Sequence, residues 1–231
     1  NPGLLGTWSN FRSSFILPSL DNEHSELLKE MTRPFILRRT KQEVLSELPE
    51  KLISKKFIDL TEKEQMGYHE MRRCAEIKFK NHKNSAERDL AKTIDINFFT
   101  ELTHLREASC SMRLVFDEWT ERSSKIDALM DILRNILPNE ANNIVVFSQF
   151  TSFLELIKPE LKRENMPFLY LDGQTPLVKR KEYVEEFQEG RCRLFLSSLK
   201  AVGVGINLTK ANYVIRLDPW WNPSVENQAM D

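Results

Sequence analysis

The sequence predicts an α/β protein in which a parallel sheet carries helices on both faces and is preceded by a mainly helical region. The first observation is that short apolar runs alternate with amphipathic segments through residues 123–231, as in successive β-α-β units. The second is that each apolar run ends on polar residues. Right-handed crossovers bring the carboxyl ends of parallel strands to one edge of a sheet, so these polar residues are expected to meet there.

Residues 1–60 mix loops with short elements. Aromatic residues among the glycines and prolines of residues 1–22 predict a short helix that packs on a larger body. Residues 23–31 predict a helix that Pro34 ends, because proline disfavours helical geometry in the residue before it. After a basic stretch, residues 52–60 have the composition of a strand.

Residues 61–122 predict a helical insertion. Thr61 and Glu64 have the spacing of a capping box, in which each side chain satisfies the backbone N–H of the other residue. The helix that follows has one apolar side, which we assign to the core. Residues 78–95 are highly charged and predict a solvated helix or a partly disordered segment, whereas residues 97–112 resume a helical pattern.

The C-terminal region carries the alternation itself. Helical spacing of apolar residues over 126–137 predicts a helix with Ser123 or Ser124 as its cap. The next helix contains Pro159, which predicts a kink or a restart, and Thr175 is the expected cap of the helix after that. The predicted strands cover residues 144–147, 168–171, 192–196 and 213–217, and the helices between the first three cover residues 152–164 and 175–188.

The composition is that of an ordinary globular protein, with 41% hydrophobic and 29% charged residues in a chain of 231. Its net charge of −1 comes from 33 basic and 34 acidic residues, so any contact with nucleic acid must come from local patches. The longest apolar runs, 144–147 and 213–215, are much shorter than the ~20 residues of a membrane span. We therefore expect no membrane partner.

Cysteine and histidine spacing predicts neither a disulfide framework nor a metal site. The three cysteines lie far apart without a Cys-x-x-Cys pair, and the four histidines have no metal-ligand spacing. A reducing compartment fits this pattern. The chain opens at Asn1-Pro2-Gly3 without an initiator Met or a signal peptide, and we expect it to be part of a longer protein.

Four polar strand ends are expected at the carboxyl edge of the sheet: Ser148-Gln149, Asp172-Gly173, Ser197-Ser198 and Asp218-Pro219-Trp220. Open α/β sheets bind ligands at this edge, and hydroxyls, amides and flexible cations hold a phosphate backbone without reading its sequence. The candidate contacts with a nucleic-acid backbone are Ser148, Gln149, Lys179, Arg180, Ser198, Lys200 and Asn207. In the alternative interpretation, the serines and the glutamine only cap helices, and the basic run is a solvated face balanced by neighbouring glutamates.

Gly203 and Gly205 allow the backbone N–H groups around them to form an anion-holding nest. A Gly-x-Gly pair alone is a weak signal. The dinucleotide-binding fingerprint requires a third glycine where this chain has Leu208. The strand that follows ends at Asp218-Pro219, and a helix is predicted from Asn222 onward.

Taken as one string, Ser197–Asp231 resembles the second motor lobe of the SWI/SNF-type ATPases, the double-stranded-DNA translocases of helicase superfamily two. The matching residues are Ser198 to Leu208, Asp218 to Pro223, Gln228, Ala229 and Asp231. Phe147–Phe150, Asp172–Thr175 and Arg180 fall on further motifs of that lobe, Pro34–Lys41 resembles the connector between the two lobes, and Leu4–Gly6 with Phe11 and Phe15 resembles the segment that leaves the first lobe. The two-Trp string before Asn222 is similar to prokaryotic members.

The resemblance implies an inter-lobe connector over residues 1–60, a helical insertion over 61–122 and a RecA-like second motor lobe over 123–231, truncated before the family's arginine motif. It adds Trp221 to the DNA contacts, and it assigns nucleotide binding and coupling to Gly203, Gly205, Gln228 and Asp231. Val202 departs from the glycine usual in the family and reshapes the nest if that position needs a positive φ.

The same resemblance implies a double-stranded-DNA translocase or remodeller. Its partners are duplex DNA, the first RecA-like lobe of the same chain and, as further candidates, DNA-bound proteins. Its cofactors are ATP and Mg²⁺, held mainly by the first lobe.

No Gly-x-x-x-x-Gly-Lys-Ser/Thr loop occurs in this sequence, so we expect no catalytic residue here and no ATP hydrolysis by this chain alone. The expected location is the cytoplasm, associated with the nucleoid, in a prokaryote, and the nucleus in a eukaryote. The alternatives are a lobe of an RNA-dependent superfamily-two helicase and a catalytically inert scaffold for nucleic acid or protein.

Overall fold

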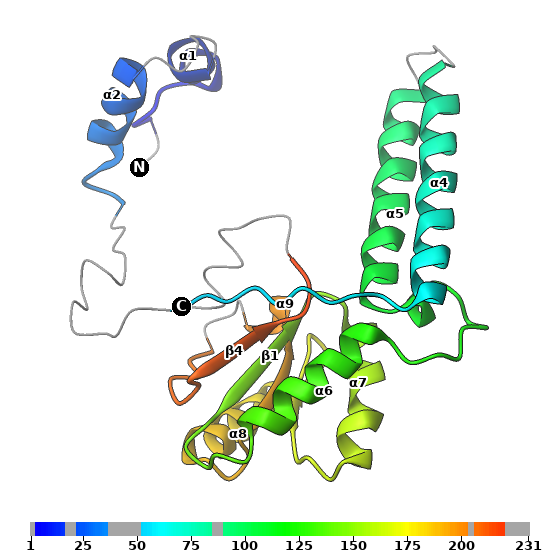
Figure 1. Cartoon of the computed structure of the whole chain (residues 1–231). Coiled ribbons are helices and arrows are strands. Elements are labelled where there is room, and N and C mark those ends of the chain that lie inside the picture. The colour runs from blue at the N-terminus through cyan, green and yellow to red at the C-terminus, as the bar shows by residue number, and fades with distance from the viewer. Residues whose placement is uncertain (1–2, 17–21, 37–51, 85–89, 203–205, 220–231) are drawn as a thin grey trace. The chain divides into compact units, whose positions relative to one another are not determined.

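The computed structural model describes residues 3–16, 22–36, 52–84, 90–202 and 206–219, and the chain divides into two units, Asn1–Ser54 and Lys55–Asp231 (Figure 1). The N-terminal unit contains helix α1 (Trp8–Phe11), a π-helical segment (Arg12–Ile16) and helix α2 (Asn22–Thr32). Thr7 caps α1 by accepting the N–H of Asn10 at 3.3 Å. No described residue of this unit is fully buried. That this segment packs on a larger body therefore stays a prediction.

The second unit is built on a four-stranded sheet with the strand order β2-β3-β1-β4, in which all neighbouring strands are parallel. The strands are β1 (Ile144–Ser148), β2 (Leu169–Leu171), β3 (Leu194–Ser198) and β4 (Tyr213–Arg216). In the β1–β3 register Ser148 lies opposite Ser198, so the polar ends of these two strands are neighbours.

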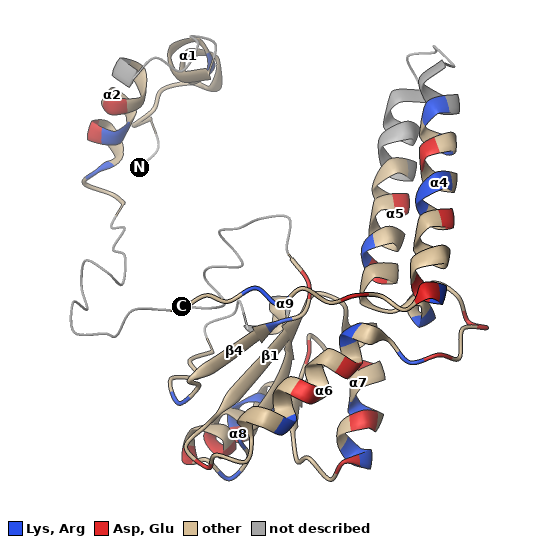
Figure 2. Ribbon diagram, viewed as in Figure 1, with Lys and Arg blue, Asp and Glu red and all other residues tan. Residues whose placement is uncertain are grey.

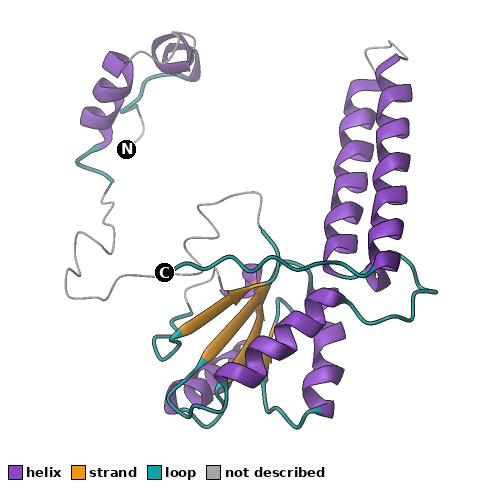
Figure 3. Ribbon diagram, viewed as in Figure 1, coloured by secondary structure: helices purple, strands orange, loops and turns teal. Residues whose placement is uncertain are grey.

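Helices cover both faces of this sheet (Figure 3). They are α6 (Ser124–Ile136), α7 (Thr151–Arg163), α8 (Leu177–Glu189) and the short α9 (Leu199–Val202). Ile144 and Val146 of β1 pack with α6 and α7, whereas Val145 and Phe147 pack with α8 and α9. Successive side chains of a strand point to opposite faces, so a strand covered on both sides appears in the sequence as an uninterrupted apolar run. The predicted fold class is confirmed.

Two long helices, α4 (Glu62–Asn84) and α5 (Leu90–Cys110), lie side by side as a hairpin before the sheet, and a 3-10 turn (Met112–Leu114) follows α5 (Figure 1). The predicted capping box is present, because the N–H of Thr61 donates to Glu64 Oε2 at 3.0 Å and the N–H of Glu64 donates to Thr61 Oγ1 at 3.3 Å. Basic and acidic side chains are interleaved along α4, α6 and α7 (Figure 2). This mixture agrees with the net charge near zero.

Three local predictions were wrong. Residues 52–61 form no strand, because strand composition alone does not provide a partner for the backbone. Helix α7 contains Pro159 and does not restart there, so that alternative was wrong, whereas the predicted kink stays a prediction. Pro176 rather than Thr175 precedes the first residue of α8, and the Thr175 hydroxyl accepts the N–H of Asp172 instead. The charged segment 78–95 is helical on both sides of residues 85–89.

Candidate functional site

At the carboxyl edge of the sheet, one buried carboxylate joins the end of β1 to the segment after β4. Asp218, two residues after β4, accepts a hydrogen bond from the Ser148 hydroxyl at 2.5 Å and another from the N–H of Gln149 at 3.1 Å. Ser148 and Asp218 are 0% and 3% exposed. The Ser148 oxygen also accepts the N–H of Phe150 at 3.0 Å. Ser148 therefore fixes the turn between β1 and α7, and its hydroxyl is not on the surface of the described chain.

Burial of Asp218 raises the pKa of its carboxyl group above the ordinary value. The hydrogen bonds from Ser148 and Gln149 and the positive charges of Lys125 and Arg106 act in the opposite direction and offset part of that effect. The carboxylate is thus a desolvated anchor between two strand ends rather than a free acid at the surface.

The other predicted serine, Ser198, is also buried, at the end of β3. Its neighbour Ser197 donates to the carbonyl of Leu171 at 3.0 Å and so ties β3 to the end of β2. Lys200 follows in α9, but its side chain lies outside the described part of the chain.

The loop between β2 and α8 is closed by hydrogen bonds to Asp172. Its Oδ1 accepts the N–H of Gln174 at 3.0 Å and both the N–H and the hydroxyl of Thr175 at 2.9 Å. Burial acts to raise the pKa of Asp172, but these hydrogen bonds outweigh it and the pKa is lowered. The carboxylate therefore stays ionised and holds the loop in one conformation.

Arg180 holds the same loop from the first turns of α8. Its Nε donates to the carbonyl of Thr175 at 2.8 Å, and one terminal nitrogen reaches the carbonyls of Asp172 and Gly173, each at 3.1 Å. The predicted role of Arg180 was a contact with nucleic acid, whereas its donors here serve the loop backbone. Lys179, beside it, is exposed.

Asn207 is exposed in the loop that leads to β4. The side chain of Gln188 in α8 fixes this loop, since its Nε2 donates to the Asn207 carbonyl at 2.9 Å and to Thr209 Oγ1 at 3.0 Å, and its Oε1 accepts the N–H of Lys210 at 3.0 Å. The Asn207 side chain is therefore presented from a held backbone. Gly203, Gly205, Trp221, Gln228 and Asp231 lie outside the described residues, so the predicted nest and the nucleotide contacts stay predictions.

Sequence reasoning missed one residue that reaches this edge from the helical hairpin. Arg106 of α5 donates to the backbone carbonyl of Pro219, and its guanidinium carbon lies 5.8 Å from the centroid of the Phe150 ring. No local pattern marks this contact, because 113 residues separate Arg106 from Pro219.

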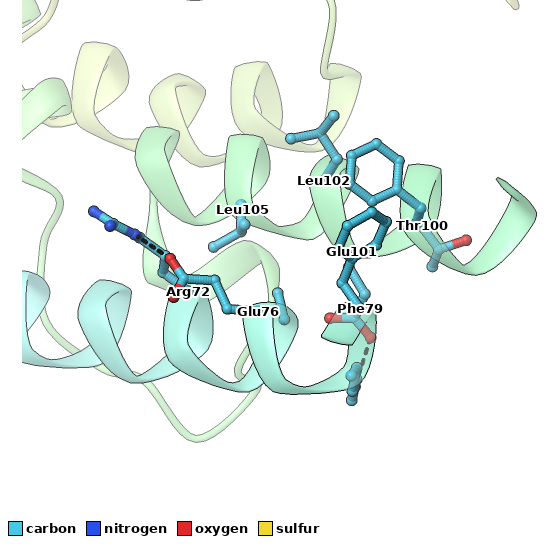
Figure 4. Close-up of a pocket in the computed structure, with 10 residues that line it drawn as sticks. Arg72, Glu76, Phe79, Thr100, Glu101, Leu102 and Leu105 are labelled. Atoms are coloured by element: carbon cyan, nitrogen blue, oxygen red, sulfur yellow. Dashed lines mark hydrogen bonds and ion pairs between the residues drawn. The ribbon is translucent and has the colours of Figure 1, made fainter. Parts of the chain in front are cut away.

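A pocket of about 510 Å³ lies between α4 and α5, away from the sheet edge (Figure 4). Apolar side chains such as Phe79 and Leu105 line it, and the ion pair of Arg72 with Glu76 stands at its margin. It gathers no nucleophile or metal-ligand set. Across the described residues, no group of three or more His, Cys, Asp or Glu side chains could hold a metal ion.

The three cysteines are free, and burial raises the pKa of the Cys110 thiol to about 11, so this group stays protonated. Among the described helices, none has the length and apolar character needed to cross a bilayer.

Two family models match almost the whole chain. The model described as an SNF2-related domain matches residues 1–114, and the helicase conserved C-terminal domain matches residues 124–231. The chain is 36% identical, over its full length, to an uncharacterized ATP-dependent helicase of Mycoplasma genitalium, of which it covers 21%. It is 52% identical over 114 residues to the DNA repair protein RAD5 of Mycosarcoma maydis, which corresponds to 47% of this chain and 8% of that protein.

Among solved structures, the SWI2/SNF2 ATPase core of Sulfolobus solfataricus in complex with double-stranded DNA matches 99% of this chain with 30% identity and a TM-score of 0.65. The match covers 49% of that core. The chain thus spans about a fifth of the Mycoplasma helicase and about half of the solved core.

Proposed function

This chain belongs to the SNF2 family of helicase-type ATPases, in which it covers the end of the first motor lobe and the second lobe, and we propose that the full protein uses ATP to move along double-stranded DNA. The part described above would supply the grip on the DNA backbone and the closure of one lobe on the other. The observation that carries the proposal is the carboxyl edge of the sheet, where the ends of β1, β3 and β4 and the β2–α8 loop are polar and are held by hydrogen bonds.

We assign two roles at this edge, one to residues that would contact DNA and one to residues that hold them. Among the first group, Lys179 and Asn207 are exposed and Gln149 is half-buried. Gln149, Lys179, Lys200, Asn207 and Trp221 would contact phosphates, because amides, cations and indole N–H groups donate hydrogen bonds to a phosphate backbone without reading its sequence. Ser148, Ser198 and Arg180 would hold the strand ends and the loop that present them. This assignment rests on the burial of Ser148 and Ser198 and on the hydrogen bonds that Ser148 and Arg180 donate within the protein.

The residues of this chain do not by themselves form a site for binding and hydrolysing ATP. ATP needs a phosphate-binding loop with a lysine, and the sequence contains no Gly-x-x-x-x-Gly-Lys-Ser/Thr string. We propose that Gly203, Gly205, Gln228 and Asp231 sense a nucleotide bound mainly by the first lobe, with Mg²⁺ held there as well.

Binding of nucleic acid by this chain tests the proposal. A short fluorescein-labelled DNA duplex is titrated with the chain, and unlabelled single-stranded RNA of the same length is used as a competitor. The expected result is sequence-independent binding to the duplex that weakens about tenfold or more between about 50 and 200 mM salt, since each neutralised phosphate releases counterions. Preference for the RNA would favour an RNA-dependent helicase lobe, and no binding to either would favour an inert scaffold.

A further inference from the structure

Arg106 connects the helical hairpin to both loops that flank the end of β1. Its guanidinium donates to the Pro219 carbonyl in the corner after β4, and it lies against the ring of Phe150 in the turn before α7. An arginine side chain is suited to this position. The edge of its planar guanidinium can donate a hydrogen bond while the positive charge interacts with the face of an aromatic ring. One residue of α5 thus contacts two separate parts of the candidate site.

The same two parts are already joined by Asp218, which accepts hydrogen bonds from Ser148 and from the N–H of Gln149. Arg106 brings positive charge to this carboxylate from α5, and Lys125 does so from α6. The corner after β4 is therefore held from within the sheet by Asp218 and from the hairpin by Arg106.

The hairpin itself is fixed at its base, so Arg106 has a firm position from which to act. The Glu64 carboxylate accepts the N–H of Thr61 at the start of α4 and the N–H of Ser124 at the start of α6. At the end of α5, the carbonyl of Cys110 accepts the Ser123 hydroxyl at 2.6 Å. These bonds attach both helices of the hairpin to the helix that covers the sheet.

We propose that Arg106 is a positioning residue that holds the β1–α7 turn and the Asp218–Pro219 corner in the arrangement with which the sheet edge grips DNA. The proposal rests on the proposed function of that edge. Arg106 acts through its neighbours: it would not need to touch the phosphates, but Gln149, which is proposed to do so, follows Ser148 in the turn that Arg106 and Asp218 hold.

Amide hydrogen exchange of the chain, followed by NMR without DNA, tests the positioning role directly. In Arg106→Ala, the amides of Gln149 and Phe150 are expected to exchange about fivefold to tenfold faster, because the turn and the corner each lose a contact worth roughly that factor. The amides of Val145 and Val146 in the middle of β1 should keep their rates. Arg106→Lys, which keeps the charge but not the planar fork, should fall between wild type and Arg106→Ala. Unchanged exchange at Gln149 in Arg106→Ala would overturn the proposal.

Duplex DNA binding by the same proteins tests the link to function. Arg106→Ala should weaken binding about threefold to tenfold with Arg106→Lys in between, whereas Arg113→Ala, which removes the same charge from an exposed site just beyond α5, should bind about as wild type does. If Arg106→Ala and Arg113→Ala weaken DNA binding equally, the loss of one positive charge explains the effect, and the positioning role is contradicted. If the wild-type chain binds no DNA, the proposed function fails, and the exchange experiment still decides whether Arg106 holds the turn.

Discussion

The backbone N–H of Ser124 donates to the carboxylate of Glu64 at 3.1 Å, so one side chain caps two helices that start 62 residues apart along the chain, at Glu62 and Ser124. Glu64 is 3% exposed, and its other oxygen completes the capping box with Thr61. The Ser124 hydroxyl also donates to it. This one buried carboxylate thereby joins the start of the hairpin to the start of α6.

Glu64→Gln should destabilise the second unit by about 1–3 kcal/mol, because an amide nitrogen replaces one acceptor where all the partners are donors. Thermal unfolding should show a melting temperature lower by roughly 3–8 °C. Glu62→Gln, which changes an exposed acid in the same turn of α4, is the matched control and should shift the melting temperature little. Equal shifts in the two variants would contradict the shared cap.

Gly67→Ala should stabilise the protein by much less than the ~1 kcal/mol that the better helix propensity of alanine gives, because the terminal methyl of Met112 must shift to make room. An added Cβ would lie 2.4 Å from Cε of Met112, which is 1% exposed, and close to the ring of Trp119. Chemical denaturation measures the change. In the Met112→Leu background, which shortens this side chain, Gly67→Ala should recover more of the gain, and simple addition of the two single effects would argue against this contact.

The free energy of unfolding of Asp218→Asn should rise relative to that of the wild type as the pH rises. The carboxyl pKa is raised in the folded protein, so the folded state holds its proton more tightly than the unfolded chain does. The stability that the carboxyl group contributes is therefore lost as the pH rises from its unfolded pKa through its raised folded pKa. An asparagine keeps an acceptor for Ser148 and Gln149 and does not titrate.

Unfolding of the two proteins at several values between about pH 4 and pH 7 gives this dependence. A stability of Asp218→Asn relative to wild type that falls with rising pH would show that the hydrogen bonds and nearby cations outweigh burial.

Arg180→Ala and Lys179→Ala should distinguish a residue that stabilises the β2–α8 loop from a residue that contacts DNA. Arg180→Ala removes the donors to three loop carbonyls and should lower the free energy of unfolding by about 1–2 kcal/mol. Lys179→Ala should leave stability unchanged, weaken duplex DNA binding at all sequences and reduce the slope of log affinity against log salt by about one. The control for Lys179 is Lys162→Ala, an exposed lysine in the last turn of α7, which begins at the carboxyl edge and runs away from it. Equal effects of the two lysine variants on DNA binding would remove Lys179 from the site.

The parts of the fold that depend on neighbours in sequence were predictable. The four strands were found within a few residues of their observed bounds. Burial on both faces leaves uninterrupted apolar runs in β1 and β3, whereas the largely exposed strand β4 was found from its β-branched and aromatic composition. The capping box of Thr61 and Glu64 was found because its partners are three residues apart.

The same kind of reasoning failed where the partner lies far away or where a loop folds on itself. The bond from Ser124 to Glu64 spans 60 residues and the bond from Ser148 to Asp218 spans 70, and no periodicity encodes either one. Arginine is a residue type that often contacts phosphates, but the guanidinium of Arg180 donates to the backbone of the Asp172–Thr175 loop, and only the conformation of that loop determines this. Sequence therefore identified the edge of the sheet and most of its residues, but not which of them are exposed.

The attachment of the hairpin at its base has a mechanical consequence. Helix α4 has 23 residues and at ~1.5 Å per residue is about 35 Å long, so a rotation of about 10° at its base would move its far end by about 6 Å. The hydrogen bonds of Glu64 and Arg106 lie at the base of the hairpin, about which such a rotation would occur. A small rotation of the sheet would thus move the far end of α4 by several ångströms.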